Sequence, residues 1–235
     1  MKISYEQSRS RAIVYDANRI EQPDERLFEP RYWREQGAIR GQARGRGSAL
    51  MLDTPFGPAV LRQYLRGGQV ARFSRDRYIF TGYRRSRPMR EVGVLAYLVR
   101  QGLPVPRPLG AICRRYGPTY QGALITRRIE GAEPLADVMG QQACDDPVWA
   151  TIGVTIRRMH EAGVVHADLN ARNILVAGDS RVYLLDFDRA VLKRGAGQRY
   201  RANLERLKRS LVKCWPSAAD GFEECWTRIK LGYSG

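Results

Sequence analysis

The chain has 235 residues, 43% of them hydrophobic, and a formal net charge of +16 at pH 7. This length and apolar content suit one substantial core or two small lobes and argue against a largely disordered chain. Four cysteines without a CxxC pair and only two histidines argue against a zinc site and indicate reduced thiols. Residues 1–17 lack the apolar core of a signal peptide, and no segment approaches the length that crosses a bilayer. We therefore expect the protein to stay in the compartment where ATP is made.

The first third of the chain predicts a strand and then a glycine-rich turn. Residues 11–15 read as a strand, and a polar connection that contains a proline follows. Residues 37–47 then carry four glycines before the apolar residues 49–52. This pattern predicts a strand, a loop and a strand, with the loop backbone at Gly45 and Gly47 able to approach phosphates closely. Surface loops also use glycine freely, so the segment by itself is weak support for a nucleotide site.

The middle of the chain predicts a strand, a helix and a boundary between two domains. Residues 60–64 alternate as a strand, and Met89 to Gln101 have helical spacing, with Glu91 in the expected first turn. Three prolines in residues 102–108 exclude a helix and predict an extended linker. After a strand at residues 123–126, a polar joint is expected to separate a first domain, residues 1–126, from a second domain, residues 127–235.

The segment HADLNARNILV, residues 166–176, and the later Asp186 carry the chemistry. A helix over Trp149 to Ala162, capped by Gly163, precedes them. Residues 174–176 and 182–185 predict a hairpin that returns Asp186 to the level of Asn173. Asp168 would then accept or orient the proton of an attacking hydroxyl, and Asn173 and Asp186 would hold Mg²⁺ beside nucleotide phosphates. The alternative is that these carboxylates are ordinary residues of turns.

Five motifs are distributed over most of residues 28–215: HADLNARN, LLDFDRA, RGRG, LRQYLRGG and GLPVPRPLGA. Through these motifs the sequence resembles the protein-kinase-like superfamily and, within it, the lipopolysaccharide kinases that phosphorylate 3-deoxy-manno-octulosonic acid (Kdo) on a lipid A precursor. The resemblance implies an α+β, bilobal, protein-kinase-like fold, with a small β-rich N-lobe and a reduced, mainly helical C-lobe. It also implies ATP and Mg²⁺ as cofactors.

The resemblance assigns further site residues. Arg62 stands where such kinases place the phosphate-binding lysine, and Glu91 either pairs with it or simply favours its helix N-terminus. Arg66 is the competing phosphate-binding candidate. The backbone of Arg127 and Ile129 would read adenine. His160 is expected to be structural. His166 is expected to brace the backbone of the catalytic loop, the HADLNARN segment at residues 166–173.

Two departures from protein kinases narrow the acceptor. Asn170 occupies the position of a lysine, so Arg172 is expected to compensate for the missing charge. The triplet at residues 186–188 lacks the glycine of a switching DFG element, and the chain after it is short and contains no APE motif. A peptide-binding platform therefore has little room.

The positive charge gathers in two segments. Residues 62–90 hold nine arginines against one acid, and residues 191–215 hold eight cations against one acid. In the second segment, the helical spacing of Leu204, Leu207, Leu211 and Trp215 allows either a basic helix on lipid headgroups or a helix that packs its leucines on the protein.

The sequence thus predicts an ATP-dependent kinase that phosphorylates a sugar hydroxyl. By resemblance, this is the 4-hydroxyl of Kdo on a lipid A precursor, at the cytoplasmic face of the inner membrane, where the protein would be peripheral. The expected partners are that lipid and an anionic membrane surface; nucleic acid is a weaker interpretation of the charge, and no protein partner is implied. The alternatives are another small-molecule or protein kinase of the same fold, or a non-catalytic basic module that binds membrane or RNA.

Overall fold

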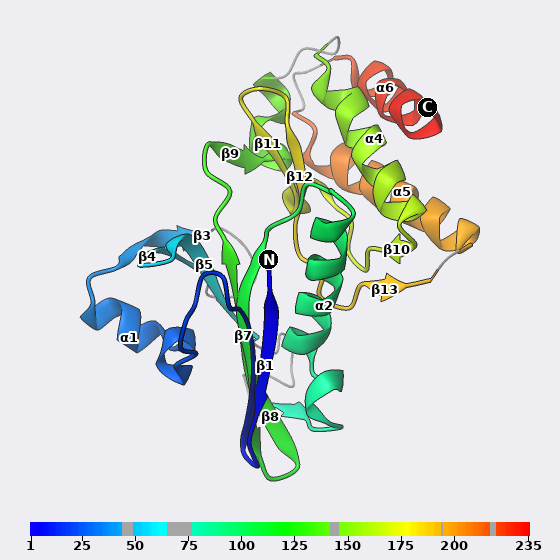
Figure 1. Cartoon of the computed structure of the whole chain (residues 1–235). Helices are drawn as coiled ribbons and strands as arrows, with labels where there is room; N and C mark the ends of the chain where they lie inside the picture. Colours follow the sequence, from blue (N-terminus) through cyan, green and yellow to red (C-terminus); the bar gives the residue numbers. More distant parts are fainter. Residues whose placement is uncertain (44–48, 65–76, 142–145, 194, 217–219) are drawn as a thin grey trace. The chain divides into compact units, whose positions relative to one another are not determined.

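The computed structural model describes residues 1–43, 49–64, 77–141, 146–193, 195–216 and 220–235 (Figure 1). The chain divides into two compact units, Met1–Ala96 with Arg107–Arg128 and Tyr97–Pro106 with Ile129–Gly235. The predicted division at residue 126 differs from this in two respects: Arg127 and Arg128 belong to the first unit, and Tyr97–Pro106 belongs to the second unit. Three hydrogen bonds join this stretch to the rest of the second unit. The Tyr97 hydroxyl donates to the Ala162 carbonyl at 2.9 Å, Arg158 donates to the Gly102 carbonyl at 2.9 Å, and the Leu184 N–H donates to the Pro104 carbonyl at 3.1 Å.

The first unit is built on an antiparallel sheet. In the described residues it has eight strands, in the order β1-β2-β7-β8-β5-β4-β3, with β6 paired to β8. The strands are β1 (Ile3–Gln7), β2 (Arg11–Asp16), β3 (Ile39–Ala43), β4 (Ala49–Thr54), β5 (Gly57–Gln63), β6 (Tyr78–Ile79), β7 (Pro108–Tyr116) and β8 (Thr119–Arg127). The helical segments are η1 (Glu25–Phe28), α1 (Pro30–Glu35), η3 (Tyr83–Arg85) and α2 (Arg87–Arg100), of which α2 runs on into the second unit.

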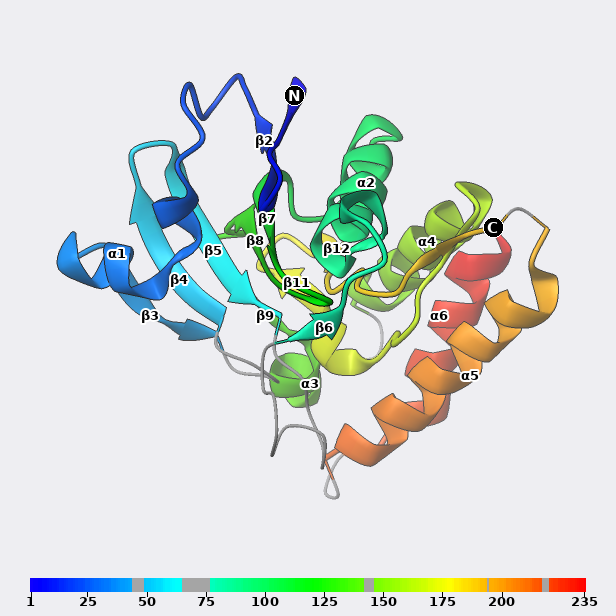
Figure 2. The same ribbon diagram turned by 90° about the horizontal axis from the view of Figure 1, so that it is seen from below.

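The alternation of side chains along the strands gives this sheet two apolar faces. Phe28 and Trp33, from η1 and α1, pack with Ile13, Leu61 and Ile125 on one face. The other face carries a second cluster, which consists of Ala12, Tyr83, Cys113 and Tyr120 with Met89 from α2 packed against it. Figures 1 and 2 accordingly show α1 on one side of the sheet and the beginning of α2 on the other.

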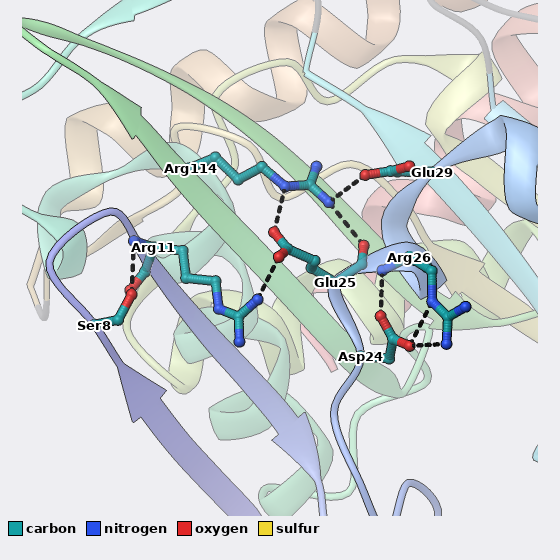
Figure 3. A network of polar contacts seen from close by, with 7 residues as sticks. All are labelled: Ser8, Arg11, Asp24, Glu25, Arg26, Glu29 and Arg114. Atoms are coloured by element: carbon teal, nitrogen blue, oxygen red, sulfur yellow. Dashed lines mark hydrogen bonds and ion pairs between the residues drawn. The ribbon is translucent and has the colours of Figure 1, made fainter.

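A network of ion pairs fastens η1 to the sheet (Figure 3). Glu25 of η1 accepts from Arg11 on β2 and from Arg114 on β7. Arg114 also donates to Glu29 at 2.9 Å and to the Glu25 carbonyl at 2.7 Å. Each pair is partly exposed and contributes at most about 1 kcal/mol. The network therefore fixes where η1 sits, while the burial of Phe28 and Trp33 supplies most of the stabilisation.

The second unit combines helices with two small sheets. Its helical segments are α3 (Leu135–Val138), η4 (Met139–Gln141), α4 (Val148–Glu161), η5 (Ala171–Asn173), α5 (Gly197–Cys214) and α6 (Phe222–Ser234). Its strands form the sheets β12-β11-β9 and β10-β13, and they are β9 (Ala132–Pro134), β10 (Val164–Val165), β11 (Ile174–Ala177), β12 (Val182–Leu184) and β13 (Val191–Leu192).

Helices α4 and α6 approach each other through glycine. A Cβ atom on Gly153 would lie 2.0 Å from the Ile229 carbonyl oxygen, and one on Gly232 would lie 2.1 Å from the Ala150 carbonyl oxygen. Both positions therefore require glycine for this contact. Figures 1 and 2 show the two helices side by side. The sequence interpretation did not include α6.

The basic helix α5 packs its leucines on the protein. Leu207 and Leu211 are fully buried, whereas Arg206, Arg209 and Lys213 are exposed. Of the two predicted arrangements for this segment, the packed one is confirmed. The predicted strands at residues 11–15, 60–64 and 123–126, the helix over residues 149–162 and the catalytic hairpin are also present.

Candidate active site

The catalytic loop is held in shape by its own amide side chains. Asn170 Oδ1 accepts from the N–H groups of Arg172 at 2.9 Å and Asn173 at 3.2 Å, which caps η5. The Asn173 Nδ2 atom donates to the Asp168 carbonyl at 2.8 Å. These bonds fix the backbone of Asp168, while its side chain remains 54% exposed. The backbone of Asp168 is therefore held in place, and its carboxylate is open to solvent.

His166 braces this loop, as predicted. Its Nδ1 atom accepts from the Asp168 N–H at 3.0 Å, and its Nε2 atom lies 2.8 Å from the Leu185 carbonyl. This arrangement places the single ring proton on Nε2. Burial of the ring lowers the pKa of His166, which keeps the ring neutral. The imidazole thus links the catalytic loop to the strand that leads to Asp186.

The hairpin brings Asp186 back beside Asn173. In its register Ile174 pairs with Leu184, and the Leu185 N–H then donates to the Asn173 carbonyl at 2.8 Å. Asp186 follows with a φ of 59°, a left-handed conformation that Asp tolerates and that is common at functional sites. The buried Phe187 packs edge-on against His166, with ring centroids 4.9 Å apart. Asp186 is thereby anchored on both sides.

The donor set at this point fits magnesium. With its Nδ2 atom donating to Asp168, Asn173 has its side-chain oxygen left to bind a cation, and Asp186 contributes carboxylate oxygens. In the described part of the chain, no three His, Cys, Asp or Glu residues gather as a metal site. Asn173 and Asp186 would each provide an oxygen ligand, which suits Mg²⁺ because this ion keeps several waters and binds substrate phosphates.

Arg172 forms an ion pair with Asp137 and not with a carboxylate of the catalytic loop. The Arg172 side chain is 61% exposed, and its guanidinium lies 3.4 Å from the carboxylate of Asp137 in α3. In this arrangement it braces η5 against α3. The prediction that Arg172 compensates for the missing lysine charge requires it to leave Asp137.

Arg62 and Glu91 form an ion pair in the first unit. Glu91 is 3% exposed and Arg62 is 23% exposed. The sequence interpretation had placed Glu91 in the first turn of its helix. Helix α2 begins at Arg87, however, so Glu91 lies beyond the first turn. Because the helix dipole acts mainly on the first turn, the pairing explains this buried carboxylate better than the dipole does.

Tyr64 completes this cluster and was not predicted. Its hydroxyl hydrogen-bonds the Glu91 carboxylate, and Arg62 Nη2 donates to the same hydroxyl at 3.3 Å. The Arg62 guanidinium also lies 5.0 Å from the centroid of the Tyr64 ring. Burial, together with the charge of Glu91, raises the pKa of Tyr64, so the hydroxyl keeps its proton and serves as a donor. The alternation predicted over residues 60–64 was the available signal, because residues 62 and 64 lie on the same side of an extended chain.

The remaining nucleotide-site candidates have different outcomes. Gly45, Gly47 and Arg66 lie outside the described residues. The Arg127 N–H donates to the Arg107 carbonyl at 2.8 Å. Recognition of adenine by the backbone of Arg127 and Ile129 stays a prediction. A cavity beside Arg127 has a volume of about 70 Å³, well below the roughly 300 Å³ of an ordinary ligand site.

Helix α5 contacts the catalytic loop through residues that the sequence interpretation did not assign. Asn203 accepts from the His166 N–H at 3.0 Å and donates to the His166 carbonyl at 2.7 Å. One turn later, Arg206 lies 3.5 Å from the Asp168 carboxylate. Ser210 then accepts from the N–H of Ala171 in η5 at 3.1 Å. The sequence did contain a signal for these contacts, because Asn203, Arg206 and Ser210 are polar residues spaced three and four apart, beside the leucines of the same helix.

His160 is structural, as predicted, and it makes stability depend on pH. The ring is buried between Tyr233 and Asn203, and burial lowers its pKa to about 4. As the pH falls from 6.5 to 4, the unfolded state binds a proton that the folded state excludes. The free energy of unfolding should therefore fall across this window, by at most roughly 3 kcal/mol. Urea unfolding at several pH values should show a smaller loss for His160→Gln than for the wild type, and equal losses would contradict the assignment.

Comparison with known proteins identifies the family. The model of the lipopolysaccharide kinase (Kdo/WaaP) family matches residues 30–233. A 3-deoxy-D-manno-octulosonic acid kinase of Xanthomonas euvesicatoria pv. vesicatoria is 46% identical over 202 residues, which cover 86% of this chain and 80% of the relative. The enzyme of the same name from Stenotrophomonas maltophilia (strain R551-3) is 44% identical over 226 residues, covering 94% of this chain and 89% of the relative.

A solved structure, that of WaaP in complex with acyl carrier protein, shares the fold. It has a TM-score of 0.57 at 16% identity and covers 93% of this chain and 88% of that chain. The predicted α+β, protein-kinase-like fold is confirmed by this similarity. The chain belongs to the lipopolysaccharide kinase (Kdo/WaaP) family and is a phosphotransferase.

Proposed function

We propose that this protein transfers the γ-phosphoryl group of ATP to the 4-hydroxyl of a Kdo residue on a lipid A precursor. Membership of a kinase family implies the use of ATP. The observation that carries the proposal is the arrangement of Asp168, Asn173 and Asp186 in one catalytic loop and hairpin, in a chain 46% identical to a Kdo kinase. Asp168 would take the proton of the acceptor hydroxyl.

In this proposal the residues of the second unit have separate tasks. Asn173 and Asp186 would hold Mg²⁺, which would neutralise charge on the nucleotide phosphates when bound. His166 and Asn170 keep the loop in its shape through hydrogen bonds to backbone groups. In the first unit, Arg62 would bind the nucleotide phosphates, held by Glu91 and Tyr64.

The acceptor is tested directly with a Kdo-bearing lipid A precursor and ATP. Mass spectrometry should show one added phosphate, and fragmentation should place it on the Kdo ring. A matched precursor whose Kdo lacks the 4-hydroxyl should stay unmodified. Phosphate on a heptose, on the lipid A sugars or on protein would identify one of the alternative kinases, and no turnover with any acceptor would support a non-catalytic role.

We also propose that the protein acts at the cytoplasmic face of the inner membrane. No helix in the described ranges is long and apolar enough to span a bilayer. Because Leu207 and Leu211 are buried in α5, attachment through this helix would rest on its exposed cations. Each cation near an anionic surface contributes about 1 kcal/mol.

The protein should therefore sediment with anionic vesicles at low salt and be released as the ionic strength rises. Neutral vesicles of matched size are the control and should bind far less. Equal binding to both would indicate apolar insertion, and binding to neither would exclude the membrane contact and return nucleic acid to consideration as the anionic partner.

A further inference from the structure

The basic helix α5 lies along the catalytic loop through one of its faces. Asn203, Arg206 and Ser210, which make the contacts, are three and four residues apart, so at about 3.6 residues per turn they point the same way. Asn203 is buried and binds the loop backbone through both atoms of its amide. The neighbouring Leu207 and Leu211 are also buried. The position of Arg206 is consequently set by anchors on either side of it, and its contact with Asp168 follows from how α5 docks.

Arg206 is the charged partner that the described structure gives to Asp168. Its Nη1 atom lies 3.5 Å from Asp168 Oδ1, and the arginine side chain is 49% exposed. The loop itself supplies no competing charge, because Arg172 reaches Asp137 and His166 is neutral. Position 170 carries an uncharged asparagine. Arg206, from helix α5, thus supplies beside Asp168 a positive charge that the catalytic loop does not supply.

The reaction proposed at Asp168 suggests what Arg206 does. In the proposed reaction, the acceptor O–H bond breaks and its proton moves to Asp168. The acceptor oxygen bonds to phosphorus, and the bond from phosphorus to the departing ADP oxygen breaks. The acceptor oxygen therefore contacts both Asp168 and the transferring phosphoryl group. The phosphoryl oxygens consequently come close to Arg206, which lies beside the Asp168 carboxylate. A guanidinium has five N–H donors in one plane, and a single long contact with Asp168 leaves others to meet those oxygens.

We infer that Arg206 holds the Asp168 carboxylate toward the acceptor hydroxyl and donates hydrogen bonds to the transferring phosphoryl group. This inference rests on the proposed function, because it assumes that Asp168 is the base. The spacing of the leucines predicts only that helix α5 packs on the protein. The inference adds a second role for α5, which is to place Arg206 beside Asp168. The transferring group carries its charge on its outer oxygens, and a fixed cation there stabilises the transition state more than the bound substrates.

The test compares Arg206→Ala and Arg206→Lys with Arg201→Ala, using the full-length protein, ATP and the Kdo-bearing precursor. Arg201 is an exposed arginine on the same helix, five residues away and so on another face. Its loss removes the same charge without removing the contact to Asp168. Arg206→Ala should lower kcat on the order of 10²-fold, with the KM for ATP changed little. Arg206→Lys should retain part of the rate, and added guanidinium ion should restore part of the Arg206→Ala rate.

Several outcomes separate the inference from the proposed function. Equal kcat values for Arg206→Ala and Arg201→Ala would overturn the inference, and so would a defect that guanidinium and lysine both fail to relieve, because that pattern indicates a purely structural role. If the wild type phosphorylates a different acceptor, the proposed function fails, and the same variants are compared on the acceptor that is used. Asp168→Asn in the same assay shows whether the base itself is assigned correctly.

Discussion

Replacing Asp168 by alanine should lower the rate of phosphoryl transfer about 10²- to 10⁴-fold while leaving the binding of ATP nearly unchanged. The side chain is half exposed and its backbone is held by Asn173 and His166, so its removal should not unfold the loop. A positioned base acts mainly in the transition state, which is why kcat should fall and nucleotide affinity should not. Turnover and nucleotide affinity, measured on the same preparation, provide the check.

The contrast with Asp186→Ala sharpens this result. Asp186 is proposed to hold Mg²⁺, so its loss should weaken Mg²⁺-dependent ATP binding as well as turnover. Asp179→Ala is a suitable control, because Asp179 is an exposed carboxylate at the other end of the same hairpin, paired with Arg181. Near-normal turnover of Asp168→Ala would exclude it as the base. If Mg²⁺ protects Asp186→Ala and wild type equally against thermal unfolding in ATP, Asp186 is not a ligand.

Arg62→Lys should behave as a disruptive change, with both ATP affinity and turnover lowered by about tenfold or more. Arg62 contacts the Glu91 carboxylate, the Tyr64 hydroxyl and the face of the Tyr64 ring. A lysine ammonium can keep the charge, but it loses the planar fork that serves these partners and a phosphate together. Arg40→Lys is the control, because Arg40 lies in an exposed ion pair with Asp53 on the same sheet.

Arg62→Ala should lower activity further and should also lower the free energy of unfolding by at most roughly 3 kcal/mol, since the buried Glu91 carboxylate would lose its ion pair with Arg62. Glu91→Gln and Tyr64→Phe should give milder versions of the same kinetic defect, because each loosens the arginine without removing it. The measurements are ATP affinity, turnover and urea unfolding for each variant. If Arg66→Ala abolishes ATP use while Arg62→Ala is nearly silent, Arg66 binds the phosphates and the pair at Arg62 is structural.

Local sequence was sufficient for the catalytic hairpin and for several elements around it. Strand and turn signals at residues 174–185 predict that Asp186 returns to Asn173, and the structure has this register. The leucines of α5 follow the helical period, and two of them are buried as that period requires. These features depend on neighbours within one or two elements, where spacing alone decides which side chains share a face.

The sequence by itself determined the family and the residues of the catalytic loop, because motifs and short-range periodicity are both written along the chain. The tertiary structure decided which distant groups support them. Tyr64 meets Glu91 across 27 positions, and Asn203 meets His166 across 37. Arg206 looks like any other cation of a basic helix until α5 docks and brings it to Asp168. Such contacts depend on how whole elements pack, and the pattern within a single element leaves that packing open.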